Sequence, residues 1–273
     1  MLEIQEKTPS IHSIIVHLLF KHCSHFLDAE LKFLWYGSLR TFRPQLTLER
    51  NSNAMTTSLL RTTPPPGQHL WWLLFWPVYW LRYPLIEHCR GAVEYLPVYC
   101  PADDLIPFCE AFILPYMLWM PLLVAVCLYT LWHDTDTFRR YSRFLVIAMS
   151  LSTVIFLLWP SCQELRPEVL PRDNLLTRCV ALLYAADTNT NVFPSEHAIG
   201  AAALWLAARH LRGPGAARLR LPLEILAALT CLSTVFLKQH SVLDLLGAAP
   251  VCFLAWWFSF RKAKHAQKIP LSH

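Results

Sequence analysis

Residues Asn191–Gly200 read NVFPSEHAIG, and they mark the point where a polar segment changes into an apolar run. The run AIGAAALWLAARHL starts at residue 198, directly after the polar letters. Ser195 precedes it, which predicts a helix N-cap with free backbone N–H groups behind it. His197 lies in the predicted first turn, where those N–H groups and the helix dipole favour an anion. The stretch therefore predicts half of a phosphate-binding site, at the start of a helix at a membrane edge.

The composition indicates a membrane protein. The 273 residues are 55% hydrophobic and 16% charged, whereas soluble domains have about 45–50% apolar and about 25% charged residues. The apolar residues also form blocks that can cross a bilayer, which needs roughly 20 residues per helix. We therefore predict an all-α fold, a polytopic membrane helical bundle. The formal net charge of +5 is small and concentrated in loops, which fits the positive-inside rule better than a nucleic-acid partner.

Six apolar blocks predict about six transmembrane helices in a membrane domain of residues 55–268. They cover residues 69–86, 107–132, 144–159, 195–211, 221–238 and 242–260. The sequences HDTDTFRRYSR and RGPGAARLR read as polar links between these helices. Residues 1–54 fit the pattern poorly, because His, Lys and Asp break their apolar segment. We predict that these residues are a dispensable N-terminal extension.

A long segment without a membrane helix, residues 160–194, separates the third and fourth predicted helices. Asp173 could cap a short amphipathic helix in this segment. The apolar side of that helix is expected to comprise Leu176, Cys179, Val180 and Leu183. Glu110 lies near the start of the second helix, where we expect it at the membrane interface or against another helix.

Basic residues gather in the links 133–143 and 209–220 and in the tail 261–268. With six helices these three segments lie on one side of the cell membrane, which the positive-inside rule makes cytoplasmic. The extracytoplasmic side then holds segment 160–194, the start of the fourth helix and the turn KQHSVLD, Lys238–Asp244. Every candidate catalytic group is therefore expected at the extracytoplasmic face.

These groups form a set suited to phosphoryl transfer. His240 and Asp244 are four residues apart, so on a helix they share one face and the carboxylate can fix the imidazole tautomer. The other ring nitrogen is then free to attack phosphorus, while His197 protonates the leaving oxygen and later activates water. Arg166, Lys238 and the N–H groups at the start of the fourth helix can hold phosphoryl oxygens as charge develops.

The sequence predicts neither a metal nor a cofactor. No Cys and His spacing suits zinc, and His197 and His240 lack a third ligand at a suitable spacing. Each candidate group also has a structural explanation when it is taken alone. A His at a helix end is usually structural, and Arg166 could simply pair with Glu164 or Glu168.

Two short motifs resemble those of the type 2 phosphatidic acid phosphatase (PAP2) superfamily. Residues 194–197, PSEH, resemble the family's Pro-Ser-Gly-His motif, with Glu196 in place of Gly. The family's second such motif reads Ser-Arg, five residues, His, three residues, Asp. His240 and Asp244 match its spacing, while Thr234 stands in the Arg position. The resemblance extends over residues 70–260 and is most specific in these two motifs.

A third family motif, Lys, six residues, Arg-Pro, is kept in part: Arg166 matches the Arg, and Trp159 stands in the Lys position. Lys238 lies one helical turn beyond Thr234 and is expected on the same face, where it would restore one cation. The resemblance implies that His240 is the nucleophile, that Asp244 orients it and that His197 is the acid and base. With the added cation, the residues expected at the phosphate are Arg166, Ser195, Glu196 and Lys238.

Three functions remain open from the sequence. The first is a membrane lipid phosphatase that hydrolyses a lipid phosphate or diphosphate through a phosphohistidine at the outer leaflet. The second is a lipid phosphotransferase with the same residues, because the FPS-x-H and KQH-x-x-x-D patterns are similar to those of inositol-phosphoceramide synthases. The third is a non-catalytic transporter or scaffold that has kept the fold. Transport is disfavoured because the ionisable groups lie at one membrane face and not at the midplane.

Overall fold

The computed structural model describes residues 68–90, 93–213 and 215–261. The chain divides into two compact units, Met1–Ala92 and Val93–His273. Regular structure in the described ranges is helical apart from the two-residue strands β1 (Leu96–Pro97) and β2 (Ser161–Cys162), which confirms the all-α prediction. The predicted extension, residues 1–54, lies outside the described residues.

The first unit contains one described helical stretch. A 3-10 helix, η1 (Gln68–Leu74), leads into α2 (Phe75–Cys89). Within α2 the rings of Phe75 and Tyr79 lie 5.5 Å apart, and the Arg82 guanidinium carbon lies 4.7 Å from the centre of the Tyr79 ring. The first predicted helix therefore exists, although its α-helical part has only 15 residues. At ~1.5 Å per residue such a helix spans about 22 Å, less than one hydrocarbon core.

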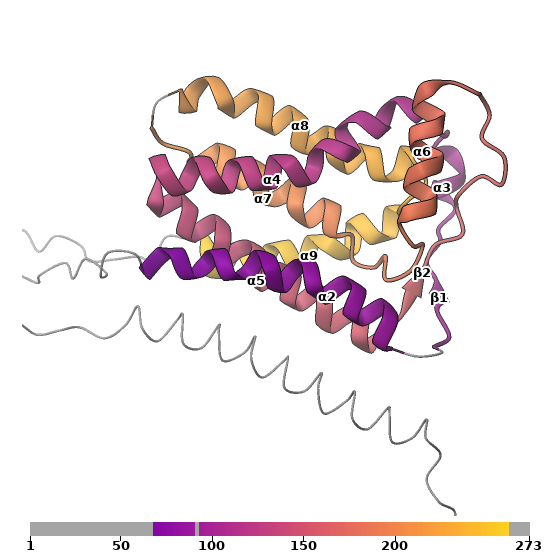
Figure 1. Cartoon of the computed structure of the whole chain (residues 1–273), viewed down its shortest axis with the longest axis horizontal. Helices are drawn as coiled ribbons and strands as arrows, with labels where there is room; N and C mark the ends of the chain where they lie inside the picture. The colour runs from indigo at the N-terminus through magenta and orange to yellow at the C-terminus, as the bar shows by residue number, and fades with distance from the viewer. Residues whose placement is uncertain (1–67, 91–92, 214, 262–273) are drawn as a thin grey trace, which may run out of the picture. The chain divides into compact units, whose positions relative to one another are not determined.

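The second unit holds the other predicted helices (Figure 1). Its helices are α3 (Ala102–Leu105), η2 (Glu110–Phe112), α4 (Ile113–His133), α5 (Thr135–Leu158), α6 (Leu175–Ala186), α7 (Glu196–His210), α8 (Ala216–Phe236) and α9 (Val242–Ser259). The predicted polar link 133–143 is wrong, because α5 already begins at Thr135. Asp134 makes this early start possible, since its Oδ1 accepts the Thr137 N–H at 3.1 Å as an N-cap. The link 209–220 is shortened in the same way by the start of α8 at Ala216.

Four helical segments of the described ranges are long and apolar enough to cross a membrane. They are Glu110–His133, which joins η2 and α4, and the helices α5, α8 and α9. With 15 residues each, α2 and α7 are shorter than these four. On α9, Leu246 is 62% exposed and Phe253 is 59% exposed, as expected for side chains that face lipid. These features confirm a membrane helical bundle, with four of the six predicted helices at spanning length.

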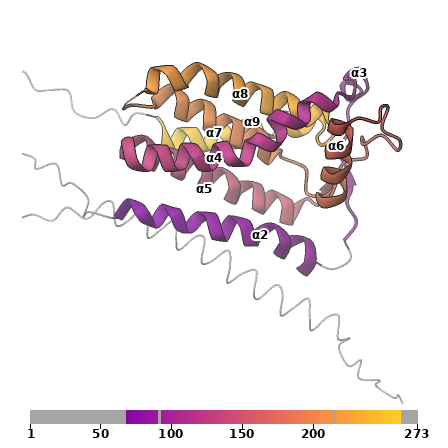
Figure 2. The same cartoon turned by 45° about the horizontal axis from the view of Figure 1, so that its top comes forward.

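Helix α7 lies at the centre of the second unit and contacts α4, α5, α8 and α9 (Figures 1 and 2). The run of small residues in its sequence explains this position, because Ala and Gly let neighbouring backbones approach closely. The buried small residues of α7 are Ala198, Gly200, Ala201, Ala203, Ala207 and Ala208. The helix that carries His197 is therefore held on all sides within the bundle.

The two polar links meet at one end of the bundle. Thr137 Oγ1 donates to the His210 carbonyl at 3.0 Å, and the Arg212 N–H donates to Asp134 Oδ2 at 2.8 Å. The ring of Phe260, just after α9, lies 4.8 Å from that of His210. The two links and the end of α9 therefore lie together at one end of the bundle, as predicted, whereas the basic tail beyond Arg261 lies outside the described residues. The start of α7 and the turn between α8 and α9 lie at the opposite end (Figure 1).

Segment 160–194 contains the expected amphipathic helix, α6, but its predicted cap is wrong. The N-cap is Asn174, whose Oδ1 accepts the Thr177 N–H at 2.9 Å. Asp173 instead pairs with Arg178 at 3.0 Å. Along the packed side Val180 is buried, whereas Cys179 is exposed and does not belong to that side.

Glu110 anchors the same segment to the membrane helices. It is buried, and its Oε1 accepts hydrogen bonds at 3.0 Å from both Arg172 and Asn174. Beneath α6, Ile113, Tyr116, Val180 and Leu237 form a buried cluster. The expectation that Glu110 contacts another element is confirmed, and its contacts fix the segment that carries Arg166 over the end of the bundle.

Candidate active site

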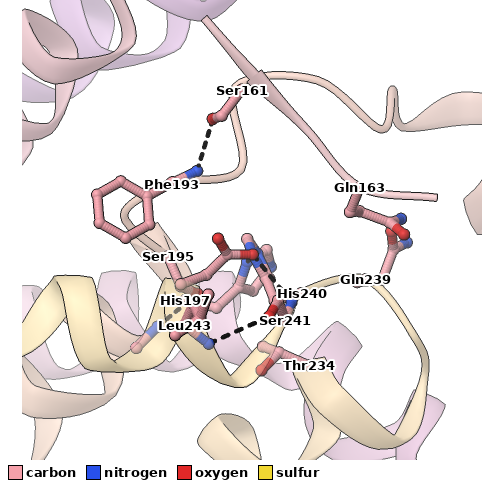
Figure 3. A network of polar contacts seen from close by, with 12 residues as sticks. Ser161, Gln163, Phe193, Ser195, His197, Thr234, Gln239, His240, Ser241 and Leu243 are labelled. Atoms are coloured by element: carbon pink, nitrogen blue, oxygen red, sulfur yellow. Dashed lines mark hydrogen bonds and ion pairs between the residues drawn. The ribbon is translucent and has the colours of Figure 1, made fainter. Parts of the chain in front are cut away.

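The turn between α8 and α9 positions His240 and Asp244. The carbonyl of Thr234 accepts the N–H groups of Gln239 at 2.9 Å and His240 at 3.1 Å, which folds the turn back onto α8. His240 Nδ1 then lies 3.1 Å from Asp244 Oδ2, which also accepts the Ser241 N–H at 3.0 Å (Figure 3). Because Asp244 is fully buried and its carboxylate accepts from Nδ1–H, the Nε2 atom of His240 keeps its lone pair.

His197 meets this pair from the first turn of α7. Its Nδ1 lies 3.4 Å from His240 Nε2, and the two ring centres are 5.5 Å apart. Two aromatic rings of α4 hold the His197 ring, with centre distances of 4.4 Å to Tyr116 and 4.2 Å to Trp119. These ring faces fix the orientation of the imidazole. The two histidines predicted to act together are therefore adjacent.

Gly200 provides the space that this aromatic contact needs. A Cβ atom at Gly200 would lie 2.1 Å from Nε1 of Trp119 and 2.8 Å from its Cε2. The Trp119 ring packs on His197, so it cannot move aside without disturbing that contact. The close approach of α4 and α7 thus depends on the absence of a side chain at Gly200.

We expect Gly200→Ala to lower the free energy of unfolding by about 1–3 kcal/mol, the usual cost of overpacking a core. Thermal unfolding of the purified protein in detergent measures this change. Adding Trp119→Phe removes the clashing indole atoms and should recover part of the loss. Equal stability of Gly200→Ala and the wild type would contradict the packing described above.

Ser195 caps α7 as the sequence predicts. Its Oγ accepts the Ala198 N–H at 3.3 Å, and its own N–H donates to the Asp244 carbonyl at 3.0 Å. The second bond ties the start of α7 to the start of α9, so it sets the spacing of the two histidines. Glu196 follows as the first residue of α7 and is half-buried.

The loop before Ser195 is held from two sides. The Phe193 N–H donates to Ser161 Oγ at 3.0 Å, which links the loop to strand β2 (Figure 3). The Phe193 ring packs on Gly247 of α9, where an added Cβ would lie 2.3 Å from the ring. Sequence motifs that are far apart are thereby joined at one end of the bundle.

Arg166 reaches the site through the turn that carries His240. Its guanidinium donates to the carbonyls of Tyr184, Asp187 and Thr188 at 3.1 Å each. It also donates to Gln239 Oε1 at 2.5 Å. These contacts differ from the simple pairing with Glu164 or Glu168 that remained open from the sequence, and they leave Arg166 beside the residue preceding His240.

Arg166 also stacks on the Tyr184 ring, with its guanidinium carbon 4.7 Å from the ring centre. Burial raises the pKa of Tyr184 to about 12. The Tyr184 hydroxyl therefore stays protonated at neutral pH and donates to the Leu237 carbonyl at 2.6 Å. Tyr184 in this way connects α6, Arg166 and the turn after α8.

Lys238 does not lie on the α8 face that was predicted for it. Helix α8 ends at Phe236, and Lys238 has a φ of 55°, which turns the chain out of the helix. Its Nζ donates to the Asp103 carbonyl at 2.6 Å. The prediction that Lys238 continues the helical face of Thr234 is wrong, because the αL residue redirects its side chain.

The two positions where the family motifs carry a cation hold uncharged residues in this chain. Trp159 is the C-cap of α5, is 51% exposed and lies 5.7 Å from the Phe193 ring. Thr234 is fully buried, and its Oγ1 donates to the Cys231 carbonyl at 2.7 Å. Its contribution to the site is the backbone carbonyl that shapes the turn.

Several residues that shape the site were missed from the sequence. Tyr116 and Trp119 are spaced three apart on α4, but nothing in their spacing distinguishes them from the other aromatic residues of the chain. Asp103 is buried and accepts the Ser241 hydroxyl at 2.6 Å and the Val242 N–H at 2.8 Å. Gln239 was missed as well, although its place between Lys238 and His240, two candidate site residues, could have drawn attention to it. In the described part of the chain, no three His, Cys, Asp or Glu side chains are grouped to hold a metal ion.

Residues 140–268 match the family model of the PAP2 superfamily. The match starts inside α5 and includes the segments that carry Arg166, His197, His240 and Asp244. No curated protein and no solved structure matches the chain. Together with four helices able to cross a membrane, the match to its family model supports membership of this chain in the PAP2 superfamily of membrane phosphatases and phosphotransferases.

Proposed function

We propose that the chain is an integral-membrane phosphatase that hydrolyses a lipid phosphate or diphosphate through a phosphohistidine. The observation that carries this proposal is the environment of His240. Asp244 lies 3.1 Å from one of its ring nitrogens, and His197 lies 3.4 Å from the other. A nucleophile held by a carboxylate and next to a second imidazole is the arrangement that covalent phosphoryl transfer requires.

In the first step, the lone pair on His240 Nε2 attacks phosphorus, and the bond between phosphorus and the lipid oxygen breaks. His197, as imidazolium, gives its proton to that oxygen, so that the lipid leaves as an alcohol, or as a monophosphate when the substrate is a diphosphate. Asp244 offsets the positive charge that develops on the His240 ring. Arg166 and the N–H groups at the start of α7 stabilise the charge on the phosphoryl oxygens.

In the second step, water attacks the phosphohistidine. Neutral His197 takes a proton from the water molecule as its oxygen bonds to phosphorus. The bond between phosphorus and Nε2 breaks, inorganic phosphate leaves, and His240 regains its lone pair. His197 is again protonated, so the cycle closes with both histidines in their starting states.

The proposed reaction takes place at the extracytoplasmic face. Support comes from the basic residues of the links at the opposite end of the bundle, which the positive-inside rule assigns to the cytoplasm. The site lies at one end of the membrane helices (Figure 1), so a lipid in the outer leaflet can present its headgroup to the site without leaving the bilayer.

A lipid phosphotransferase is the second candidate, because only the acceptor in the second step differs. One observation favours it: a pocket of about 330 Å³ adjoins the loops of Arg166 and His240. Its lining includes polar groups able to bind an alcohol, from Tyr99, Asp104 and Glu164. In that case a lipid or polyol hydroxyl takes the place of water.

The test is a phosphate-release assay on purified full-length protein with a panel of labelled lipid phosphates and diphosphates. Free labelled phosphate supports the phosphatase, whereas label found only on an added alcohol supports the phosphotransferase. Vanadate should inhibit either reaction, because it mimics the five-coordinate phosphorus of the transition state. Absence of both products with every lipid, from a folded preparation, would favour the transporter or scaffold.

A further inference from the structure

We infer that the side-chain amides of Gln163 and Gln239 bind oxygens of the phosphoryl group, an inference that rests on the reaction proposed above. Gln163 is 0% and Gln239 is 3% exposed. The Nε2 atom of each is buried and has no hydrogen-bond partner among the described residues. Buried polar groups in proteins are nearly always paired. Two unpaired amide donors in adjoining loops at this site indicate a ligand that supplies the acceptors.

Neighbouring groups fix the orientation of both amides. Gln163 Oε1 accepts the Leu165 N–H at 2.7 Å, and Gln239 Oε1 accepts from Arg166 Nη2 at 2.5 Å. Exchanging the oxygen and nitrogen of either amide would place an N–H₂ group against another donor. Each Nε2 must therefore point away from these contacts. In Figure 3 the two amide groups point toward one another beside the turn that carries His240.

The donors belong to two loops that contact each other at the site. Gln239 directly precedes His240, and both backbone N–H groups donate to Thr234. Gln163 is held by Asn189, through its N–H at 2.9 Å and its carbonyl at 2.8 Å. Nε of Arg166 is likewise buried without a partner among the described residues. Three N–H donor groups thus lie on linked, hydrogen-bonded loops beside the turn that carries the nucleophile.

A tetrahedral phosphoryl anion matches these donors. Its oxygens are strong acceptors, and hydrogen bonds to an anion are stronger than those between neutral groups. The positions where the family motifs carry cations hold Trp159, which is 51% exposed, and Thr234, whose hydroxyl already has a partner. The two amides are neutral donors. They therefore replace those cations in the contacts to the phosphoryl oxygens.

Titration calorimetry of the full-length protein in detergent with inorganic phosphate tests this assignment. Gln239→Glu keeps the oxygen that accepts from Arg166 but replaces the donor by a second acceptor. We expect its Kd for phosphate to rise about tenfold to a hundredfold, the effect of losing a charge-assisted hydrogen bond. Gln163→Glu, which keeps the contact to Leu165, should weaken binding to a similar extent. Val169→Glu is the matched control, because it adds the same charge on the Gln163 loop at a side chain that is 82% exposed.

The outcomes separate the donor role from a structural role. If Gln239→Leu weakens binding but Gln239→Glu binds as the wild type does, Gln239 only positions Arg166 and the inference is overturned. If Gln163→Glu and Gln239→Glu both bind as the wild type does, the amides face a buried water, and the inference is equally overturned. If the wild type itself does not bind phosphate, the proposed function fails with it. Melting temperatures show which variants are folded, and where only one Glu variant folds, the Kd of that variant decides.

Discussion

Replacing His240 by Ala is expected to lower kcat for phosphate release by about 10⁴-fold or more, the usual effect of removing a covalent nucleophile. The Nε2 atom that faces His197 is lost, so the phosphohistidine cannot form. Rapid acid quenching with a labelled lipid phosphate measures the second consequence, which is that no label remains on the protein. The wild type and His197→Ala should both retain label, and His197→Ala should retain more because its intermediate is hydrolysed slowly.

Two further variants separate chemistry from folding. His240→Asn keeps an N–H group that can donate to Asp244, so this variant should be folded and equally inactive. His133→Ala is the matched control: it removes an exposed imidazole at the end of α4 and should leave kcat unchanged. Phosphate release by His240→Asn at a rate within tenfold of the wild type would rule out His240 as the nucleophile.

The second large effect is expected for Asp244→Asn, with a loss in kcat of about 10³–10⁴-fold. In the wild type, Asp244 Oδ2 accepts hydrogen bonds from both His240 Nδ1–H and the Ser241 N–H. An Asn oxygen in the place of Oδ2 can keep both contacts, but a neutral amide cannot offset the positive charge that develops on the His240 ring during attack on phosphorus. The transition state therefore loses this electrostatic stabilisation, while Nε2 of His240 keeps its lone pair.

Steady-state kinetics and thermal unfolding together test this explanation. The melting temperature should change little, because Asn fills the same volume and keeps the capping contact at the start of α9. Asp136→Asn provides the matched control, since Asp136 pairs with Arg140 at the opposite end of the bundle and its side chain is 62% exposed. A wild-type kcat for Asp244→Asn would show that the charge of the carboxylate has no part in catalysis.

The arrangement of the site explains why these effects should be large. Ser195 at the start of α7 binds the carbonyl of Asp244 at the start of α9 at 3.0 Å. Asp103, from α3, binds the hydroxyl of the α9 N-cap. The starts of α7 and α9 are therefore tied to each other and to α3, so the two histidines are positioned before any substrate binds. Such preorganisation is the main source of electrostatic catalysis.

The fold class and the paired histidines could be predicted from the sequence, since each depends on local signals. Apolar blocks of membrane length specify helices wherever they pack. Ser195 is an N-cap because of its own side chain, and His240 and Asp244 meet because residues four apart share a helical face or turn. Helix starts were less predictable: Asp134 extended α5 into a charged link, and Asn174 replaced Asp173 as the cap of α6.

Only the tertiary structure decided which distant residues complete the site. Lys238 was expected beside Thr234, but its left-handed backbone turned the side chain toward Asp103. The aromatic rings on His197 come from α4, and the amide of Gln163 comes from the loop after β2, at positions where periodicity carries no information. By itself the sequence determined the membrane helices, their caps and the local pairing of His240 with Asp244, because these follow from contacts within a few residues. The packing of α7 against four neighbouring helices determined which side chains surround that pair. Contacts between side chains of different helices depend on the relative positions of those helices, which local sequence does not specify.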